Sequence, residues 1–185
     1  SYWLERGGFK TSIIATKKVG HVHFIYTGEG EKLQHFFEAL KPQLLEDTEE
    51  LTANMRARGG GIIDLNLVDK RSDMENYWQI EALFDTCDSM GANFINSCLE
   101  QFSKTLQSAI EADESFTAEE KAIQVVMCIL SNYTPECVVR AEVSCKVEEL
   151  NGDAGISPEE FAQKDVESTR APQAKASSSN LKNTL

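Results

Sequence analysis

The order of strand-like and helix-like segments predicts an α+β fold, a ferredoxin-like antiparallel sheet with helices on one face. Through Leu130 the order reads strand, helix, strand, strand, helix, strand, which is the ferredoxin-like arrangement. The helical segments place apolar residues three or four apart, whereas the strand segments alternate or are rich in β-branched residues. With 41% hydrophobic residues in a chain of 185, there is enough apolar material for one packed core.

The chain begins with a predicted strand pair. Residues 9–19 are rich in Thr, Ile and Val, and residues 21–26 alternate between polar and apolar side chains, as a half-buried strand does. We place the turn of this pair near residues 18–20, which end in a glycine.

Two histidines lie on one face of the second of these strands. Val22, Phe24 and Tyr26 share one face, which leaves His21 and His23 on the other. Two histidines at this spacing could chelate a metal, but no third ligand is near in sequence. A solvated or partner-facing sheet surface is therefore favoured.

Two helical stretches follow. The first has an apolar face made by Leu33, Phe36, Phe37 and Leu40. Pro42 interrupts it, and a second stretch with an acidic outer surface continues to Met55. In residues 56–61, two arginines and three glycines end the helix. This segment is either a basic turn with a flexible connector or a place where Arg56 or Arg58 faces a phosphate.

The next segments complete the predicted sheet. Residues 62–68 and 77–84 form a hairpin, because a link as short as residues 69–76 does not suit a parallel crossover. Residues 123–130 form a further strand, and residues 138–147 alternate again.

Between these strands the alternating pattern gives way to a long amphipathic helix that runs to about Glu111. We expect Asp88 to cap this helix, with Gly91 and Asn93 beside it, where a helix start leaves backbone N–H groups unpaired. Such a place can hold an anion. The predicted apolar stripe includes Met90, Phe94, Cys98, Phe102 and Leu106.

Composition excludes several classes of function. The 18 basic and 30 acidic residues give a formal net charge of -12, which repels nucleic acid and anionic membranes. No apolar run reaches the roughly 18 residues of a membrane span, and no signal peptide is recognisable. Five scattered cysteines without a metal-binding spacing predict buried thiols in a reducing, cytoplasmic compartment; they are Cys87, Cys98, Cys128, Cys137 and Cys145.

The helix start carries a resemblance to a known family. Asp88, Ser89, Met90, Gly91, Ala92 and Asn93 closely resemble the DAMG(A/M)N signature of hydroxymethylglutaryl-CoA (HMG-CoA) reductases, and the alanine before asparagine resembles the bacterial class II branch. Supporting stretches lie at residues 6–9, 59–64, 94–97, 129–132 and 156–161. The resemblance covers residues 1 to about 164.

The resemblance implies a domain organisation and a function. Residues 9–131 would be the small NAD(P)-binding domain, residues 1–8 and 132–164 parts of a larger, truncated α+β substrate domain, and residues 165–185 an unrelated disordered tail. The family reduces HMG-CoA to mevalonate and CoA by two hydride transfers, its full-length members are oligomeric, and HMG-CoA would bind only with the missing part of the large domain.

Site residues follow from the same resemblance. It implies that the signature residues bind the cofactor, that Asn132 lies on the substrate side, and that the catalytic residues have no counterpart in this chain. Relatives that prefer NAD have an acidic residue near the position of Thr52. Because a threonine there, one turn from Arg56, tolerates a 2′-phosphate, we expect NADPH rather than NADH. No metal is expected.

Two other classes of function remain open. A ferredoxin-like regulatory or small-ligand-binding module would share the fold, but it has no need of the turn at residues 88–93. A protein-interaction domain would account for the acidic surface and for an uncovered apolar segment at residues 137–147.

Overall fold

The computed structural model describes residues 3–144 and residue 157. The chain divides into two compact units, one of Ile13–Val139 and one of Ser1–Ser12 with Arg140–Leu185. The predicted disordered tail at residues 165–185 and most of the stretch at residues 156–161 lie outside the described residues.

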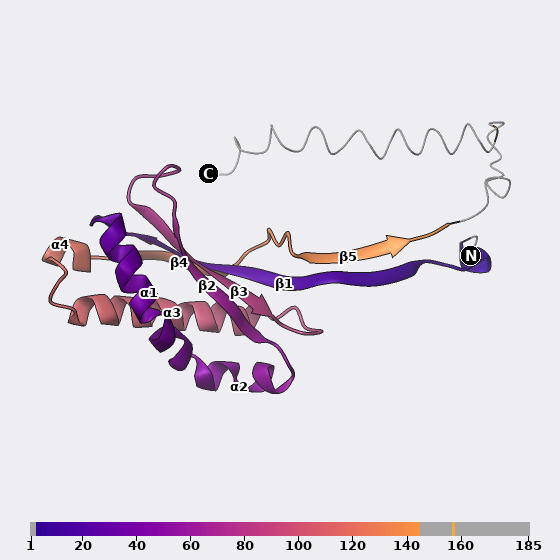
Figure 1. The fold of residues 1–185 in the computed structure, drawn as a ribbon, viewed down its shortest axis with the longest axis horizontal. Coiled ribbons are helices and arrows are strands. Elements are labelled where there is room, and N and C mark those ends of the chain that lie inside the picture. The colour runs from indigo at the N-terminus through magenta and orange to yellow at the C-terminus, as the bar shows by residue number, and fades with distance from the viewer. Residues whose placement is uncertain (1–2, 145–156, 158–185) are drawn as a thin grey trace. The chain divides into compact units, whose positions relative to one another are not determined.

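The sheet has the predicted ferredoxin-like order. Its strands are β1 (Lys10–Ile25), β2 (Gly61–Asp69), β3 (Tyr77–Asp85), β4 (Gln124–Leu130) and β5 (Cys137–Glu142). The order across the sheet is β2-β3-β1-β4, and β5 also pairs with β1. Within this path β1 is antiparallel to both neighbours, and β2 and β3 form the predicted antiparallel hairpin. The predicted fold class is therefore confirmed (Figure 1).

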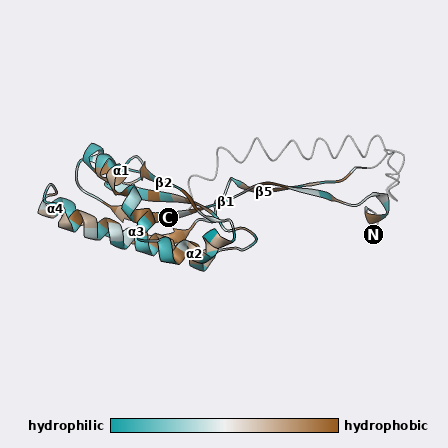
Figure 2. Cartoon of the chain, turned by 60° about the horizontal axis from the view of Figure 1, so that its bottom comes forward, coloured by the Kyte–Doolittle hydropathy of each residue, from teal (hydrophilic) through white to brown (hydrophobic). Residues whose placement is uncertain are grey.

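The helices are α1 (Gly30–Glu46), α2 (Glu49–Ala57), α3 (Ala92–Ala112) and α4 (Ala118–Lys121), after a short 3-10 turn at Leu4–Arg6. Figure 2 shows hydrophilic and hydrophobic residues alternating along α1 and α3, as expected for helices that cover a sheet. Among the described residues, no helix has both the length and the apolar character that a membrane span requires.

The core of the larger unit lies between the sheet and the helices. Its largest fully buried side chains include Phe24, Tyr26, Phe37, Trp78, Phe84 and Phe102. They come from β1, α1, β3 and α3, apart from Tyr26, which directly follows β1, and they belong to one contiguous apolar cluster. The packing of these side chains holds the end of β3 and the start of α3 in place. It therefore positions the turn between them.

The predicted strand pair at the start of the chain is wrong, because Lys10–Ile25 is a single strand. Gly20 lies within it, paired with Ala82 on one side and Leu130 on the other. A Cβ atom at Gly20 would lie 2.7 Å from Leu99 Cδ1 and 2.9 Å from Ile95 Cγ2. The glycine is therefore needed for the close approach of α3 and does not make a turn.

The predicted interruption at Pro42 is also wrong, because α1 runs through it to Glu46. The break between α1 and α2 lies instead at residues 47–48. There the buried Thr48 hydroxyl donates to the carbonyl oxygens of Leu44 and Leu45, at 3.1 and 2.9 Å. This side-chain bonding to the preceding turn marks the end of α1.

The short helix α4 was not predicted from the sequence, and its hydrogen bonds connect α1 to the sheet. Thr117 and Glu120 form a capping box at the start of α4. The Glu120 carboxylate also accepts hydrogen bonds from Lys32 Nζ at 2.8 Å and from the Tyr26 hydroxyl at 3.2 Å. These bonds, that of Lys32 foremost, lower the pKa of Glu120 to about 2.

The cysteines only partly match the expectation of buried thiols. Cys98 is buried, and desolvation raises the pKa of its thiol to about 12. Cys87 and Cys128 are half-buried, whereas Cys137 is exposed, contrary to expectation. All four are free thiols, and Cys145 lies outside the described residues.

Candidate functional site

The turn between β3 and α3 is closed by hydrogen bonds of its own residues. The N–H of Ser89 donates to the Thr86 carbonyl at 3.0 Å, and the Ser89 hydroxyl donates to the same oxygen at 2.8 Å. The N–H of Cys87 donates to Asp85 Oδ1 at 2.8 Å. Cys87 itself has a φ of 53°, which non-glycine residues rarely adopt. These hydrogen bonds therefore hold the backbone of the turn in one conformation.

Gly91 is the N-cap residue of α3. Its φ is 74°, its carbonyl accepts the first helical hydrogen bond from Ile95, and no side chain caps the helix. A Cβ atom at this position would lie 2.4 Å from Thr86 Cγ2. Both the positive φ and the close approach of Thr86 therefore require glycine at this position.

The backbone donors at this helix start have no partner within residues 3–144. No described residue accepts a hydrogen bond from the N–H groups of Met90, Gly91, Ala92 or Asn93. A helix N-terminus with unpaired N–H groups and the positive end of the helix dipole attracts a bound anion. The turn thus offers donors to an anion such as phosphate, and cofactor binding here stays a prediction.

Asp88 does not cap the helix, which corrects the sequence expectation. The helix begins three residues later than a cap at Asp88 would allow, and the exposed Asp88 carboxylate pairs with Arg58 Nη2. This ion pair balances the negative charge that would otherwise lie beside a bound phosphate.

Met90 and Asn93 are both exposed, although Met90 was expected in the buried stripe of the helix. Met90 is 71% exposed because it precedes the first helical residue and does not share the helix face. Asn93 lines a pocket of about 310 Å³ between α2 and the start of α3. Its other lining residues are Leu51, Asn54, Met55, Arg58, Phe94 and Ser97.

Thr52 and Arg56 lie together, but they line a different pocket. That pocket, of about 290 Å³, involves α1, α2 and the start of β2. Thr52 is buried and its hydroxyl donates to the Glu49 carbonyl at 3.1 Å, while Arg56 Nη2 donates to the same oxygen at 3.1 Å. The structure therefore groups Asn93 with Arg58 and not with Thr52 and Arg56.

The sequence analysis missed Asn54, Ser97 and Lys18 in this region. Asn54 could have been found, because Leu51, Asn54 and Arg58 fall on one helix face at a spacing of three and four residues, and Ser97 because it follows Asn93 by four residues on α3. Lys18 carries no such signal. It lies on β1, and its ammonium group reaches the turn after β3.

Asn132 lies exposed in the loop after β4. The preceding residue, Ser131, donates its N–H to the Val19 carbonyl at 2.8 Å, which anchors the start of this loop to β1. Asn132 does not line either of the two pockets beside α2, and its expected place on the substrate side stays a prediction.

The two histidines of β1 bond to their neighbours on β3. His21 Nε2 lies 3.5 Å from Glu81 Oε2, and His23 Nδ1 lies 2.5 Å from the Tyr77 hydroxyl. Burial, and then the nearby His21, lowers the pKa of His23. Over residues 3–144 no group of three His, Cys, Asp or Glu side chains is arranged to hold a metal ion.

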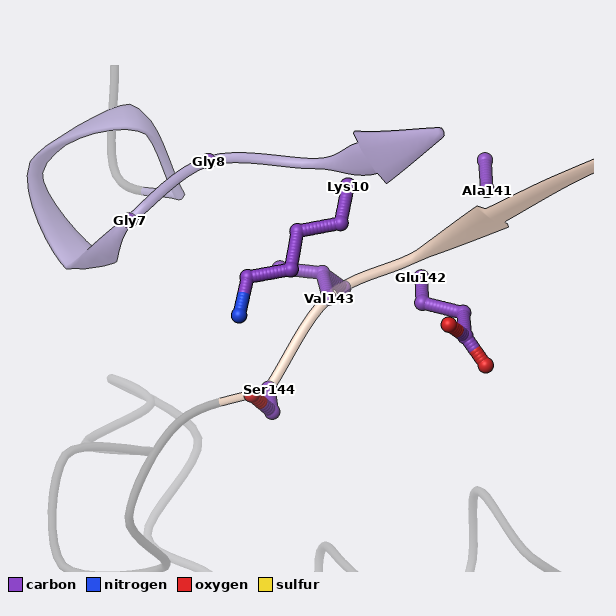
Figure 3. A pocket seen from close by; sticks show the side chains of 7 residues that line it. All are labelled: Gly7, Gly8, Lys10, Ala141, Glu142, Val143 and Ser144. Atoms are coloured by element: carbon purple, nitrogen blue, oxygen red, sulfur yellow. The ribbon is translucent and has the colours of Figure 1, made fainter. Parts of the chain in front are cut away.

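The smaller unit has a pocket of its own, of about 640 Å³. It is lined by Gly7, Gly8, Lys10, Ala141, Glu142, Val143 and Ser144. In Figure 3 the charged ends of Lys10 and Glu142 point away from each other. None of the cofactor-binding or substrate-side residues expected from the sequence lines it.

Comparison with solved structures supports the fold. The chain is similar to the class II 3-hydroxy-3-methylglutaryl-CoA reductase of Streptococcus pneumoniae bound to NADPH in open conformations, with a TM-score of 0.73, 24% identity, and coverage of 94% of this chain and 43% of that one. Another structure of the Streptococcus pneumoniae enzyme matches with a TM-score of 0.72, 24% identity, and coverage of 91% and 37%. The chain thus spans less than half the length of these enzymes.

Comparison with curated protein sequences found no match. The family model of hydroxymethylglutaryl-coenzyme A reductase, however, matches residues 1–184, nearly the whole chain. That match agrees with the signature at residues 88–93 and with the ferredoxin-like sheet order. The chain belongs to the hydroxymethylglutaryl-coenzyme A reductase family.

Proposed function

We propose that this chain is the cofactor-binding part of a class II HMG-CoA reductase, which reduces HMG-CoA to mevalonate and CoA. In this proposal residues 9–131 form the NAD(P)-binding domain, and residues 1–8 and 132–164 belong to the large substrate domain. The observation that carries it is the turn at Gly91, where α3 begins with N–H groups that have no acceptor in the part of the chain that the structure describes. A small-ligand or interaction module would not require this turn.

The residues of the turn fit a dinucleotide. The N–H groups of Met90, Gly91 and Ala92 have no acceptor among the described residues, so a pyrophosphate can bind to them. Asn93 is exposed one position into the helix and offers a neutral amide donor. When bound, the nicotinamide cofactor supplies the hydride, and these residues hold and orient it.

The preference for NADPH has two candidate sources in this chain. Thr52 and Arg56 are the pair expected from the sequence, but Glu46 and Glu49 line the same pocket, and Arg56 Nη1 lies 3.7 Å from Glu49 Oε1. We favour Arg58, because it lines the same pocket as Asn93 and lies beside the turn through its pair with Asp88. An arginine guanidinium offers several donors to a phosphate.

The proposal also includes an expectation about catalysis and one about cellular location. With no counterpart of the family's catalytic Glu, Lys, Asp and His identified in these 185 residues, we expect this chain to bind the cofactor without turning over HMG-CoA. The scattered cysteines, without a metal-binding spacing, favour a reducing, cytoplasmic location.

The experiment is a titration of the chain with NADPH, followed by nicotinamide fluorescence. We expect saturable binding that is lost in Gly91→Val, because the added side chain meets Thr86. Gly7→Val is the matched control, since Gly7 also has a positive φ of 98° but no described residue lies within 4 Å of an added Cβ. Equal binding by both variants, or no binding by the unmodified chain, contradicts the proposal.

A further inference from the structure

Lys18 contacts the turn between β3 and α3 more extensively than any local sequence pattern suggests. Its Nζ donates to the Thr86 hydroxyl at 2.8 Å, to the Ser89 carbonyl at 2.6 Å and to the Met90 carbonyl at 3.1 Å. A lysine ammonium has three N–H donors, so all of them are used within this one turn. The side chain is half-buried on β1, a strand that is well anchored on both sides.

The Thr86 hydroxyl completes this cluster. It accepts from Lys18 and donates to the Ser89 carbonyl at 2.7 Å. Thr86 is only 1% exposed, and it is the residue against which Gly91 is packed. Lys18 therefore donates hydrogen bonds both to the side chain that packs against Gly91 and to backbone carbonyls of the same turn.

These contacts determine which way the backbone donors of the turn face. In a trans peptide unit the C=O and the following N–H point in opposite directions. Because the carbonyls of Ser89 and Met90 point at Lys18, the N–H groups of Met90 and Gly91 point away from it. No described residue accepts a hydrogen bond from either group, so both are left free for a ligand.

We propose that Lys18 is a positioning residue for cofactor binding. It holds two carbonyls inward, so that the two N–H groups that follow them face the pyrophosphate of the dinucleotide. Its positive charge, on the inner side of the turn, adds to the attraction of the helix start for an anion. This inference rests on the proposed cofactor-binding function and adds to it a residue outside the signature.

The test compares the NADPH affinity of Lys18→Met with that of Lys17→Met. The Lys17 change removes the same charge from the adjacent position of β1, but Lys17 pairs with Glu136 at 2.7 Å and does not contact the turn. We expect Lys18→Met to weaken NADPH binding by about tenfold or more, as for the loss of hydrogen bonds to a charged group. Lys17→Met should bind as the unmodified chain does, and Lys18→Arg should restore part of the affinity.

Undiminished binding by Lys18→Met, beside clear binding by the unmodified chain, overturns the inference alone. No NADPH binding by the unmodified chain overturns the proposed function and this inference with it. Thermal unfolding of each variant, followed by circular dichroism, identifies any variant that fails to fold.

A measurement on the unmodified chain keeps the inference testable if Lys18→Met does not fold. Without cofactor, the amide hydrogens of Met90 and Gly91 should exchange quickly, whereas that of Ser89, which donates to Thr86, should exchange slowly. NADPH should slow the exchange at Met90 and Gly91. If these two amides are already protected as strongly as Ser89 in the free chain, the proposed orientation is wrong.

Discussion

Replacing Gly91 with alanine should destabilise the chain more than the same replacement at Gly59. Both glycines have a positive φ, 74° and 90° respectively, and a left-handed conformation costs a non-glycine residue about 1–2 kcal/mol. At Gly59 no atom of the described residues lies within 4 Å of an added Cβ, whereas at Gly91 the Cβ would lie 2.4 Å from Thr86 Cγ2. Relieving such an overlap in a packed site costs about 1–3 kcal/mol more.

The assay is urea unfolding, followed by tryptophan fluorescence, which the fully buried Trp78 makes sensitive to unfolding. The Gly91→Ala/Thr86→Ser double variant should recover part of the difference, because serine lacks Cγ2 but keeps the hydroxyl that bonds to Ser89. Recovery should be incomplete, since Thr86 Cβ would still lie 2.8 Å from the new atom. Equal costs at Gly91 and Gly59, within about 0.5 kcal/mol, would refute the reasoning.

Three further predictions concern cofactor choice, pH and packing. Arg58→Met should weaken NADPH binding about tenfold and NADH binding less, since both cofactors lose the charge that balances Asp88 but only NADPH loses a partner for its 2′-phosphate, while Arg56→Met should affect neither; the reverse result would assign the 2′-phosphate to the pocket of Thr52. Glu120→Gln should cost about 2–3 kcal/mol at pH 7. Because the folded pKa of Glu120 is depressed to about 2 from 4.5, this cost should shrink as the pH falls below 4.5 and vanish near pH 2, and a cost in urea unfolding that is independent of pH would contradict it. Gly20→Ala should lower the melting temperature measured by circular dichroism, because its Cβ would overlap two α3 side chains; an unchanged value would show that α3 can move aside.

The sequence predicted the sheet order because strand and helix patterns depend on local periodicity. Buried residues such as Phe24, Phe37 and Phe102 recur at spacings that identify the element on which they lie. The hairpin of β2 and β3 was equally predictable, since a short polar link restricts the topology.

The sequence-based predictions were wrong or incomplete where a residue contacts another residue that is distant in sequence. Gly20 resembles a turn residue, but it makes room for side chains of α3. Asp88 resembles a helix cap, but it pairs with Arg58, thirty positions earlier. Lys18 contacts a turn 68 to 72 positions away. Local patterns carry no information on such pairings, which depend on the register of strands and helices in the folded chain.

The candidate site was predictable in part. The signature at residues 88–93 identified the turn, and Gly91 has the positive φ and close packing that explain its glycine. The separation of Thr52 and Arg56 from Asn93 was not predictable. It depends on which side of α2 faces the start of α3, and this is determined by the packing of the two helices.

The most direct test of the central claim is to map NADPH onto the chain by the chemical shifts of its backbone amides. We predict that saturating NADPH changes the shifts of residues 90–94 most strongly, with smaller changes at Arg58 and Asn54 in the adjoining pocket. Changes centred on the pocket of Lys10 and Ser144, or no changes at all, would contradict the assignment of the cofactor to the start of α3.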